Sequence, residues 1–397
     1  MPALETLYWA AAACVAYPYA VYPAWLAFQS RVRPRPVRRR AGELPSLTVV
    51  LAAHDEAEAV ARRVREFRRA IVAQELHGAV VVVSDGSTDD TAEAARRAAR
   101  EGDDSVPVTV LELTENRGKA AALTAGCLAA GNDVLALADS RQTWEPDALT
   151  RLLENFADPD VGAVGGELLV EAKPGVMAGV GLYWRFEKWM RRSEGLTGST
   201  VGVTGAICAV RRELFRPIPD GTILDDVYWP LDVVAQGYRV VFDGRARALD
   251  RLPDKVGAEF RRKVRTLSGN FQLVARRPEW LSPRMNPAWF AFVSHKLARL
   301  LVPWALIATF VLSAALGGPI YGSLFVIQSL GTLLGLSGLH GATARRSKLA
   351  SAGASFLVLN AAAWVALWVW ASGRAGRSWT RTTYAADRPA LVGGASR

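Results

Sequence analysis

The chain has 397 residues, of which 50% are hydrophobic, and its mean hydropathy is +0.11. It is therefore too long for one small domain and too apolar for an ordinary soluble enzyme, so part of it is expected to lie in lipid. The formal net charge is +10, but the basic residues gather beside apolar stretches and no nucleic-acid-binding motif is present. Membrane lipid is thus the simpler partner. The cysteines match no metal-binding or disulfide pattern and are expected to be packed thiols: Cys14, Cys127 and Cys208.

The chain opens with an apolar segment, residues 1–30, in which Thr6 to Ser30 carry no charge. This length suits a transmembrane helix, which needs about 20 apolar residues. No basic leader of a cleavable signal peptide precedes it, so we expect a retained anchor. Arginines crowd residues 31–45. Because Lys and Arg accumulate on the cytoplasmic side of membrane spans, this basic linker is expected to face the cytoplasm.

Strand-like and helix-like patterns alternate from about Ser46, and we assign residues 46–284 to one cytoplasmic domain. Such an order predicts an α/β domain with a mostly parallel sheet and helices on both faces. The predicted elements are a strand ending in AAHDE, a helix over Ala57–Ala73, a strand over Ala79–Ser84 with its helix, a strand over Val106–Leu113, a helix over Gly118–Ala130 and a strand over Asp133–Ala138.

Two more uncharged stretches follow, Leu300–Ala344 and Leu349–Gly373. The first is long enough for two spans, and a Gly-Gly-Pro sequence at 317–319 interrupts it. Residues 285–373 are therefore predicted to hold an interfacial segment and three transmembrane helices, followed by a polar tail over 374–397. Basic residues at 345–348 favour a cytoplasmic loop before the last span. The arginines of the tail disagree, because four spans would place the tail outside.

Carboxylates follow three of the predicted strands: Asp55 and Glu56 end the first, Asp85 the second and Asp139 the fourth. In a doubly wound sheet these strand ends share one edge, where ligands bind. Converging carboxylates repel one another unless a cation or a polyhydroxyl ligand lies among them. A divalent cation with a sugar nucleotide would satisfy them, since Mg²⁺ and Mn²⁺ prefer carboxylate and phosphate oxygens. The alternative is that these side chains only cap the turns and helices that follow.

The segments together resemble the family 2 inverting glycosyltransferases with a glycosyltransferase-A fold, in particular the membrane synthases of cellulose, hyaluronan and poly-N-acetylglucosamine. The resemblance covers about Ser46 to Ala275 and rests on four motifs in order: AAHDE, SDGSTDDT, LADSRQ and TILDDVYWP. It implies that Asp55 and Glu56 face the base and ribose of the donor and that Asp85 contacts uridine. Asp139, in the place of the DxD motif, is implied as the ligand of Mg²⁺ or Mn²⁺.

The fourth motif implies the catalytic base. An inverting transfer needs a carboxylate that takes the proton of the acceptor hydroxyl. The resemblance assigns this role to Asp226, with Asp225 positioning it or the acceptor. Alternatively, both aspartates could simply favour the positive end of a helix. The glycine-rich segment GSTVGVTGA resembles the acceptor-side loop of the family, so Gly205 and Ala206 would border the acceptor pocket.

Two motifs depart from the family pattern. Arg141 replaces the second Asp of DxD; a guanidinium cannot bind a cation, but it could pair with the donor phosphates. Arg262 and Arg265 lie in the place of Q-x-x-R-W, where they would contact the leaving diphosphate. The alternative is a basic helix that faces solvent or lipid. Thr266 stands where the family has Trp, which puts processive synthesis in doubt.

The sequence thus predicts an integral protein of the cytoplasmic membrane whose cytoplasmic domain transfers a sugar from a nucleotide-sugar, a UDP-sugar in the first place. The acceptor would be a growing polysaccharide or another glycan. Transfer of a single sugar to a lipid carrier, and a non-catalytic membrane scaffold with the same fold, are the alternatives. The identity of the sugar depends on a few hydrogen bonds in a pocket and is not predicted.

Overall fold

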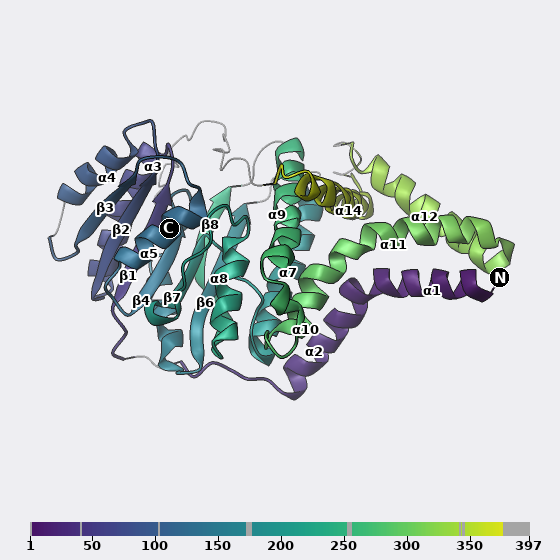
Figure 1. The fold of residues 1–397 in the computed structure, drawn as a ribbon, viewed down its shortest axis with the longest axis horizontal. Helices are drawn as coiled ribbons and strands as arrows, with labels where there is room; N and C mark the ends of the chain where they lie inside the picture. Colours follow the sequence, from purple (N-terminus) through teal and green to yellow (C-terminus); the bar gives the residue numbers. More distant parts are fainter. Residues whose placement is uncertain are drawn as a thin grey trace, which may run out of the picture.

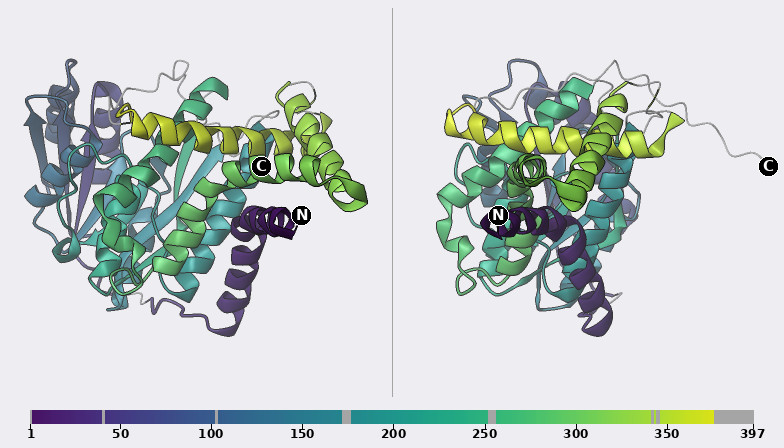
Figure 2. Two further views of the ribbon diagram at one scale, coloured as in Figure 1. Left: turned by 45° about the vertical axis from the view of Figure 1, so that its right-hand side comes forward. Right: turned by 90° about the vertical axis from the view of Figure 1, so that its right-hand side faces the viewer.

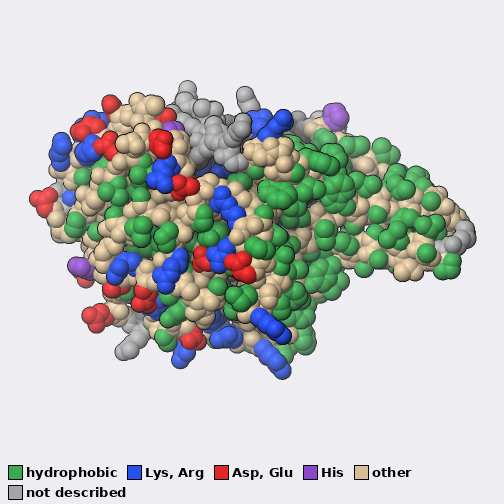
Figure 3. Space-filling view, viewed as in Figure 1, with side chains coloured by type: hydrophobic (Ala, Val, Ile, Leu, Met, Phe, Trp, Pro, Cys, Tyr) green, Lys and Arg blue, Asp and Glu red, His purple; other side chains and the backbone are tan. Residues whose placement is uncertain are grey.

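The computed structural model describes residues 2–39, 42–101, 104–171, 177–251, 256–340, 343 and 346–375. A sheet with its covering helices forms one end of the molecule, and long helices project from the other end (Figure 1). Charged side chains dot the surface of the sheet region, whereas the projecting helices show hydrophobic side chains and uncharged atoms with almost no charged group (Figure 3). The molecule therefore divides into a water-compatible part and a lipid-compatible part.

The sheet has eight strands in the order β3-β2-β1-β4-β7-β6-β8-β5. β1 to β4 are mutually parallel, β7 runs antiparallel to β4 and β6, β8 is parallel to β6, and β5 is antiparallel to β8. The predicted parallel sheet is confirmed for its first half. The strands are β1 (Leu47–Ala53), β2 (Gly78–Asp85), β3 (Val108–Leu113), β4 (Val134–Asp139), β5 (Thr143–Trp144), β6 (Val161–Glu171), β7 (Ile207–Arg211) and β8 (Arg239–Arg251).

Helices cover both faces of the sheet, which explains why β1 is buried along its whole length and apolar except for Thr48. Val49 and Leu51 pack in the core that includes α3, α4 and α6, whereas Val50 and Ala52 pack in the core that includes α5 and α8. The helices on the first face are α3 (Ala57–Ala73), α4 (Thr91–Arg100) and α6 (Ala148–Leu153). Those on the second are α5 (Lys119–Ala129) and α8 (Asp225–Ala235).

Four helices are long and apolar enough to cross a membrane: Pro2–Val32, Trp289–Leu316, Gly318–Ser337 and Lys348–Ala371. The first comprises α1 (Pro2–Ala16), a π-helical turn η1 (Tyr17–Val21) that contains Pro18, and α2 (Tyr22–Val32). The second comprises α10 (Trp289–Ala291), the π-helical η5 (Phe292–Leu297) and α11 (Ala298–Leu316). The last two are α12 (Gly318–Ser337) and α14 (Lys348–Ala371).

Two helices, α7 (Met177–Thr197) and α9 (Val256–Arg276), stand between the sheet and the apolar helices (Figure 1). A buried polar network ties α7 to the membrane helices. The His295 ring lies 2.8 Å from Glu187 Oε1 through Nε2 and 2.7 Å from Glu194 Oε1 through Nδ1, and the Tyr22 hydroxyl donates to Glu194. Because buried polar groups need partners, this network fixes α2 and η5 against the sheet domain. Short 3₁₀ helices complete the fold: η2 (Glu154–Ala157), η3 (Arg212–Leu214) and η4 (Pro278–Leu281).

Candidate active site

The register of the parallel strands brings the predicted carboxylates to one edge of the sheet. Ala53 pairs with Ser84, and Ala52 pairs with Asp139. Asp55, Asp85 and Asp139 therefore leave the sheet at nearly the same level, as predicted. The loops that follow the strands are joined, because the Glu56 carboxylate accepts a hydrogen bond from the Ser140 hydroxyl.

Asp85 is fully buried at the end of β2. Its Oδ1 accepts a hydrogen bond from the Arg117 N–H at 2.9 Å, and its Oδ2 accepts one from the Gly118 N–H at 2.7 Å. Gly118 has φ +88° and immediately precedes α5. In the structure, then, Asp85 anchors the start of α5 and positions Lys119, while its contact with uridine stays a prediction.

Asp55 takes a left-handed backbone conformation with φ +53°. Such a conformation is costly for a non-glycine residue and is tolerated where the surroundings fix it. Here Asp55 Oδ1 accepts hydrogen bonds from the Thr88 N–H at 2.7 Å and from the Thr88 hydroxyl at 3.2 Å. The backbone hydrogen bond from Thr88 is the main reason why the pKa of Asp55 lies below its ordinary value. Asp55 is thus an ionised group that binds two loops together at the sheet edge.

Lys119 lies among the carboxylates, in the first turn of α5. Its Nζ is 2.6 Å from Asp139 Oδ1 and 3.9 Å from Asp225 Oδ2. Burial disfavours the charged ammonium, but the negative charges of Asp139, Asp225 and Asp226 outweigh it and raise the pKa of Lys119. Lys119 is therefore cationic. Sequence reasoning missed this residue, although its place after an Asn-Arg-Gly turn that opens a helix was a usable signal.

Asp225 and Asp226 begin α8 and differ in exposure. Asp225 is buried, and burial raises its pKa to about 6, with Asp226 and Asp139 adding to the effect and Lys119 opposing it. Asp226 is half-buried. A Cβ on Gly205 would lie 3.4 Å from Asp226 Cβ and 3.3 Å from Lys119 Nζ. Gly205 thus lines the same small region as both charged groups, as expected of a glycine that leaves room for a close approach.

Ala206, the neighbour of Gly205, is buried, and its carbonyl accepts a hydrogen bond from the Trp144 indole N–H at 3.0 Å. On the other side of Gly205, the Thr204 hydroxyl accepts a hydrogen bond from Arg191 of α7 at 2.8 Å. The loop predicted to border the acceptor is therefore held from both sides. Sequence reasoning did not identify Arg191 as one of its supports.

Arg262 and Arg265 both lie on α9, the first half-buried and the second exposed. The later part of α9 contacts the segment before α8. Gln272 Oε1 accepts a hydrogen bond from the Ile223 N–H at 2.9 Å, and the Arg276 guanidinium donates to the Thr222 hydroxyl at 2.6 Å. These bonds were not foreseen from the sequence. They hold the TILDD segment and so fix where Asp225 and Asp226 enter the site.

The donor atoms around Asp139 decide which cation could bind. The Asp139 side chain is 26% exposed, so it remains accessible at the sheet edge, and half-buried Arg141 follows two residues later. Among the residues that the structure describes, no group of three or more His, Cys, Asp or Glu side chains is arranged to hold a metal ion. These residues do not fit a cation that is bound by protein ligands alone. They fit a cation whose coordination is completed by phosphate oxygens, which Mg²⁺ commonly accepts as ligands.

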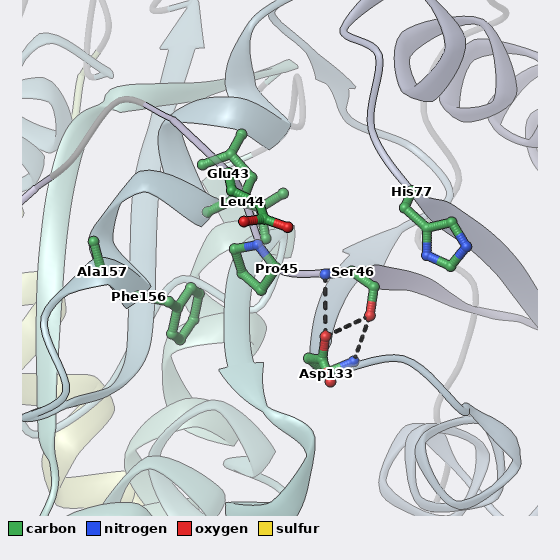
Figure 4. A pocket seen from close by; sticks show the side chains of 9 residues that line it. Glu43, Leu44, Pro45, Ser46, His77, Asp133, Phe156 and Ala157 are labelled. Atoms are coloured by element: carbon green, nitrogen blue, oxygen red, sulfur yellow. Dashed lines mark hydrogen bonds between the residues drawn. The ribbon is translucent and has the colours of Figure 1, made fainter.

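A pocket of about 510 Å³ lies at the opposite edge, where β1, β2 and β4 begin (Figure 4). Ser46, His77 and Asp133 are among its lining residues. The Ser46 hydroxyl donates to Asp133 Oδ2 at 2.6 Å, and Asp133 N–H donates back to that hydroxyl at 3.0 Å. These bonds join the starts of β1 and β4. The pocket is separate from the carboxylate edge and plays no part in the candidate active site.

The fold is similar to that of a mannosyltransferase from Pyrobaculum calidifontis, solved in complex with GDP-Man and Mn²⁺. The TM-score is 0.70 at 21% sequence identity, and the match covers 94% of this chain and 99% of that chain. The similarity confirms the predicted class of fold, a glycosyltransferase-A type α/β domain with a mostly parallel sheet, here accompanied by apolar helices that suit a membrane.

Residues 48–218 match the model of glycosyl transferase family 2, and residues 136–327 match that of glycosyl transferase family group 2. The chain therefore carries glycosyl transferase family 2 domains, as the sequence predicted, and these matches support the predicted class of enzyme, a glycosyltransferase. It is also similar to the poly-beta-1,6-N-acetyl-D-glucosamine synthases of Staphylococcus aureus strain COL, with 25% identity over 59% of this chain and 57% of the relative, and of Staphylococcus epidermidis, with 22% identity over 50% and 48%. The chain spans only about half the length of these relatives.

Proposed function

We propose that this protein transfers a sugar, with inversion, from a nucleoside diphosphate sugar to a glycan or lipid-linked acceptor at the membrane surface. The observation that carries the proposal is the position of Lys119 among Asp139, Asp225 and Asp226, directly beside Gly205. A cation and several carboxylates at the carboxyl edge of a parallel sheet suit a ligand that combines a diphosphate with sugar hydroxyls.

On the donor side, we assign the base and ribose to the edge formed by Asp55, Glu56 and Asp85, and the diphosphate to the region of Lys119 and Asp139. The leaving diphosphate gains negative charge as the glycosidic bond breaks. Lys119 is placed to stabilise that charge, because its pKa keeps it protonated. We propose three further phosphate contacts, Arg141, Arg262 and Arg265. Arg141 follows β4 and the other two lie on α9, so binding of the donor would have to bring these side chains together.

A divalent cation, Mg²⁺ or Mn²⁺, is proposed to accompany the donor, with Asp139 as its protein ligand. The Mn²⁺ present with GDP-Man in the structurally similar mannosyltransferase supports a divalent cation. When bound, the cation would neutralise phosphate charge. It would compete with Lys119 for Asp139, since Lys119 Nζ lies 2.6 Å from Oδ1 of that carboxylate.

On the acceptor side, we assign the general base to Asp226. Asp226 takes the proton of the acceptor hydroxyl, the hydroxyl oxygen bonds to the anomeric carbon, and the bond from that carbon to the diphosphate breaks on the opposite face. The half-buried position of Asp226 beside Gly205 supports this assignment. Asp225 is more buried and lies closer to Lys119, so we assign it to positioning rather than proton transfer.

Similarity to the staphylococcal synthases favours a polysaccharide as the product. A second candidate, addition of one sugar to a lipid carrier, is favoured by Thr266, which stands where the polysaccharide synthases carry Trp. For either product we place the catalytic domain on the cytoplasmic side of the membrane, because arginines lie in the last turn of the first apolar helix and in residues 33–39 after it. Membrane lipid is then a neighbour of the acceptor site.

Release of nucleoside diphosphate by lipid-reconstituted protein tests the proposal. UDP-, GDP- and dTDP-sugars would be supplied with and without Mg²⁺ or Mn²⁺, and sugar attached to extracted lipid or to polymer would be measured separately. One donor should turn over, with stimulation by a divalent cation. Asp226→Asn should lower turnover by at least about 10³-fold while donor binding persists, because only the proton acceptor is lost. Exposed Asp104, which lies outside the four motifs, offers a matched control, Asp104→Asn, which should keep full turnover.

The outcomes separate the alternatives. Polymer that lengthens on one acceptor supports the synthase, whereas a single sugar on lipid supports the carrier enzyme. Donor binding without turnover for every donor would favour a non-catalytic scaffold. Full turnover by Asp226→Asn would show that another group is the base.

A further inference from the structure

The fourth apolar helix, α14, has the length of a transmembrane helix but not the contacts of one. It has 24 residues, and after Lys348 it contains no charged side chain. At 1.5 Å per residue, a helix of this length reaches about 36 Å, enough to cross a bilayer core. Length and composition therefore favour a transmembrane span. The packing of α14 is the observation that can contradict this interpretation.

The views show that α14 runs across the other apolar helices. α1, α11 and α12 project lengthwise away from the sheet domain in Figure 1, where α14 is strongly foreshortened. In the right-hand view of Figure 2, α14 is seen at full length while α11 is viewed nearly along its axis. A bilayer that α1 and α11 cross would therefore have α14 lying along it rather than through it.

The ring and glycine contacts of α14 with the other apolar helices lie at one level of the bundle. Its first half packs on the last turn of α12, where a Cβ on Gly335 would lie 3.0 Å from the Gly353 carbonyl oxygen. Its middle contacts Tyr19 through Phe356 and Trp304 through Trp364. Tyr19 lies in the second half of the helix Pro2–Val32, and Trp304 lies in the first half of α11, so both are on the side nearer the sheet domain.

At the far level of the bundle, the helices pack on one another. Tyr8 of α1 contacts Tyr321 of α12 beside the Gly317 turn, with ring centroids 5.2 Å apart, and Phe310 of α11 contacts Phe325 of α12 at 4.8 Å. A helix that crossed the bilayer would meet partners at both levels. The contacts named above for α14 lie only at the level nearer the sheet domain.

The last half of α14 packs on the sheet domain itself. Ala362 and Ala366 of α14 are buried with Val264 of α9, and Phe271 of α9 stacks on Trp370 at 5.8 Å. The opposite face exposes Trp364 and Trp368, which are 40% and 54% exposed. Tryptophan is enriched where a membrane meets water, so this face suits the level of the lipid headgroups.

Basic residues flank both ends of α14. Arg346 and Lys348 lie at its start, and Arg374 follows its end, with further arginines at 377, 381 and 388 in the sequence. If α14 crossed the bilayer, one of these two groups would lie on the outer side, against the usual distribution of Lys and Arg. If α14 lay along the cytoplasmic leaflet, both groups would meet anionic lipid, which attracts basic residues.

We propose that α14 does not cross the membrane but lies along its cytoplasmic surface, between the lipid and α9, so that three of the four apolar helices in the described residues are spans. The chain then leaves α14 on the side of the catalytic domain. Because α9 also holds the TILDD segment through Gln272 and Arg276, α14 forms a lipid-facing support beneath one wall of the candidate active site.

Cysteine labelling tests the side on which α14 ends. In a background in which Cys14, Cys127 and Cys208 are replaced by alanine, single cysteines would be placed at Ser372→Cys and, as a second variant, at Ala371→Cys, both exposed. Ala73→Cys would mark the catalytic domain, and Pro319→Cys would mark the turn between α11 and α12. Full-length protein in sealed membrane vesicles would meet a membrane-impermeant maleimide before and after permeabilisation. Size-exclusion elution would check that each variant is folded.

The labelling pattern depends only on the side of the membrane on which each cysteine lies. Its outcome is therefore independent of whether the proposed transferase activity is found. We expect Ser372→Cys and Ala371→Cys to react under the same condition as Ala73→Cys and the opposite condition to Pro319→Cys. Reaction together with Pro319→Cys would overturn the proposal and establish a fourth span.

Discussion

Lys119 Nζ lies 2.6 Å from Asp139 Oδ1 and so brings the first turn of α5 against the end of β4. Lys119 begins α5 and Asp139 ends β4, so the whole helix and the strand that follows it separate the two residues in the sequence. Their ion pair is half-buried, where charge interactions are stronger than at an exposed surface. It defines the point at which we place the donor diphosphate.

Replacing Lys119 by methionine removes this charge with little loss of side-chain volume. We expect Lys119→Met to lower kcat/KM by about 10²-fold or more, the typical effect of losing a group that stabilises developing negative charge. Weaker binding of nucleoside diphosphate should accompany the loss. Lys188→Met removes the ion pair between Lys188 of α7 and Glu167 of β6. It is the matched control and should retain nucleotide affinity. Unchanged nucleotide affinity in Lys119→Met would place the diphosphate elsewhere.

Asp85 should matter first for stability. An amide at this position has one acceptor oxygen, so Asp85→Asn would leave either the Arg117 N–H or the Gly118 N–H facing another donor. We expect a loss of about 2 kcal/mol or more in the free energy of unfolding, visible as a lower Tm in thermal unfolding. Asp90→Asn is exposed and serves as the control. An unchanged Tm together with weaker uridine binding would instead favour a direct ligand contact.

Asp225 predicts a dependence of stability on pH. Its pKa is raised from 3.8 to about 6 by burial, so the folded state holds the proton more tightly than the unfolded state. The stabilisation from this group is therefore fully present below pH 3.8 and is lost as pH rises through about 6. The side chain of Asp225→Asn does not titrate. The Tm of this variant minus the Tm of the wild type should therefore be a few degrees larger at pH 8 than at pH 4.5. A Tm difference that does not change with pH would contradict this assignment.

Gly205 should be sensitive to a single methyl group. A Cβ there would lie 3.3 Å from Lys119 Nζ and 3.4 Å from Asp226 Cβ, so one of these side chains must shift by a few tenths of an ångström. We expect Gly205→Ala to lower kcat by about tenfold, since small displacements at a reacting centre are costly, with little change in donor affinity. A Cβ on Gly198 has no atom within 4 Å, so Gly198→Ala is the control. Equal activity of the two variants would remove Gly205 from the site.

Much of the sheet domain could be predicted because its signals are local. Ala57–Ala73 was predicted as a helix and forms one with the same bounds, and the predicted strand over Ala79–Ser84 lies within β2. Apolar runs that stop at Asp-rich turns indicate buried parallel strands, and parallel strands must expose their carboxyl ends at one edge. The placement of Asp55, Asp85 and Asp139 at that edge followed from this rule.

The sequence by itself determined the fold class, the family, the apolar helices and the strand-end carboxylates, since each depends on composition, periodicity or a short motif. Only the tertiary structure decided that Asp85 is buried against backbone N–H groups, that Lys119 lies among the carboxylates and that Gln272 holds the TILDD segment. These relationships join residues far apart in the chain, and their partners are chosen by packing. The orientation of α14 belongs to the same group, because an apolar helix of that length has the same sequence pattern whether it crosses a bilayer or lies along it.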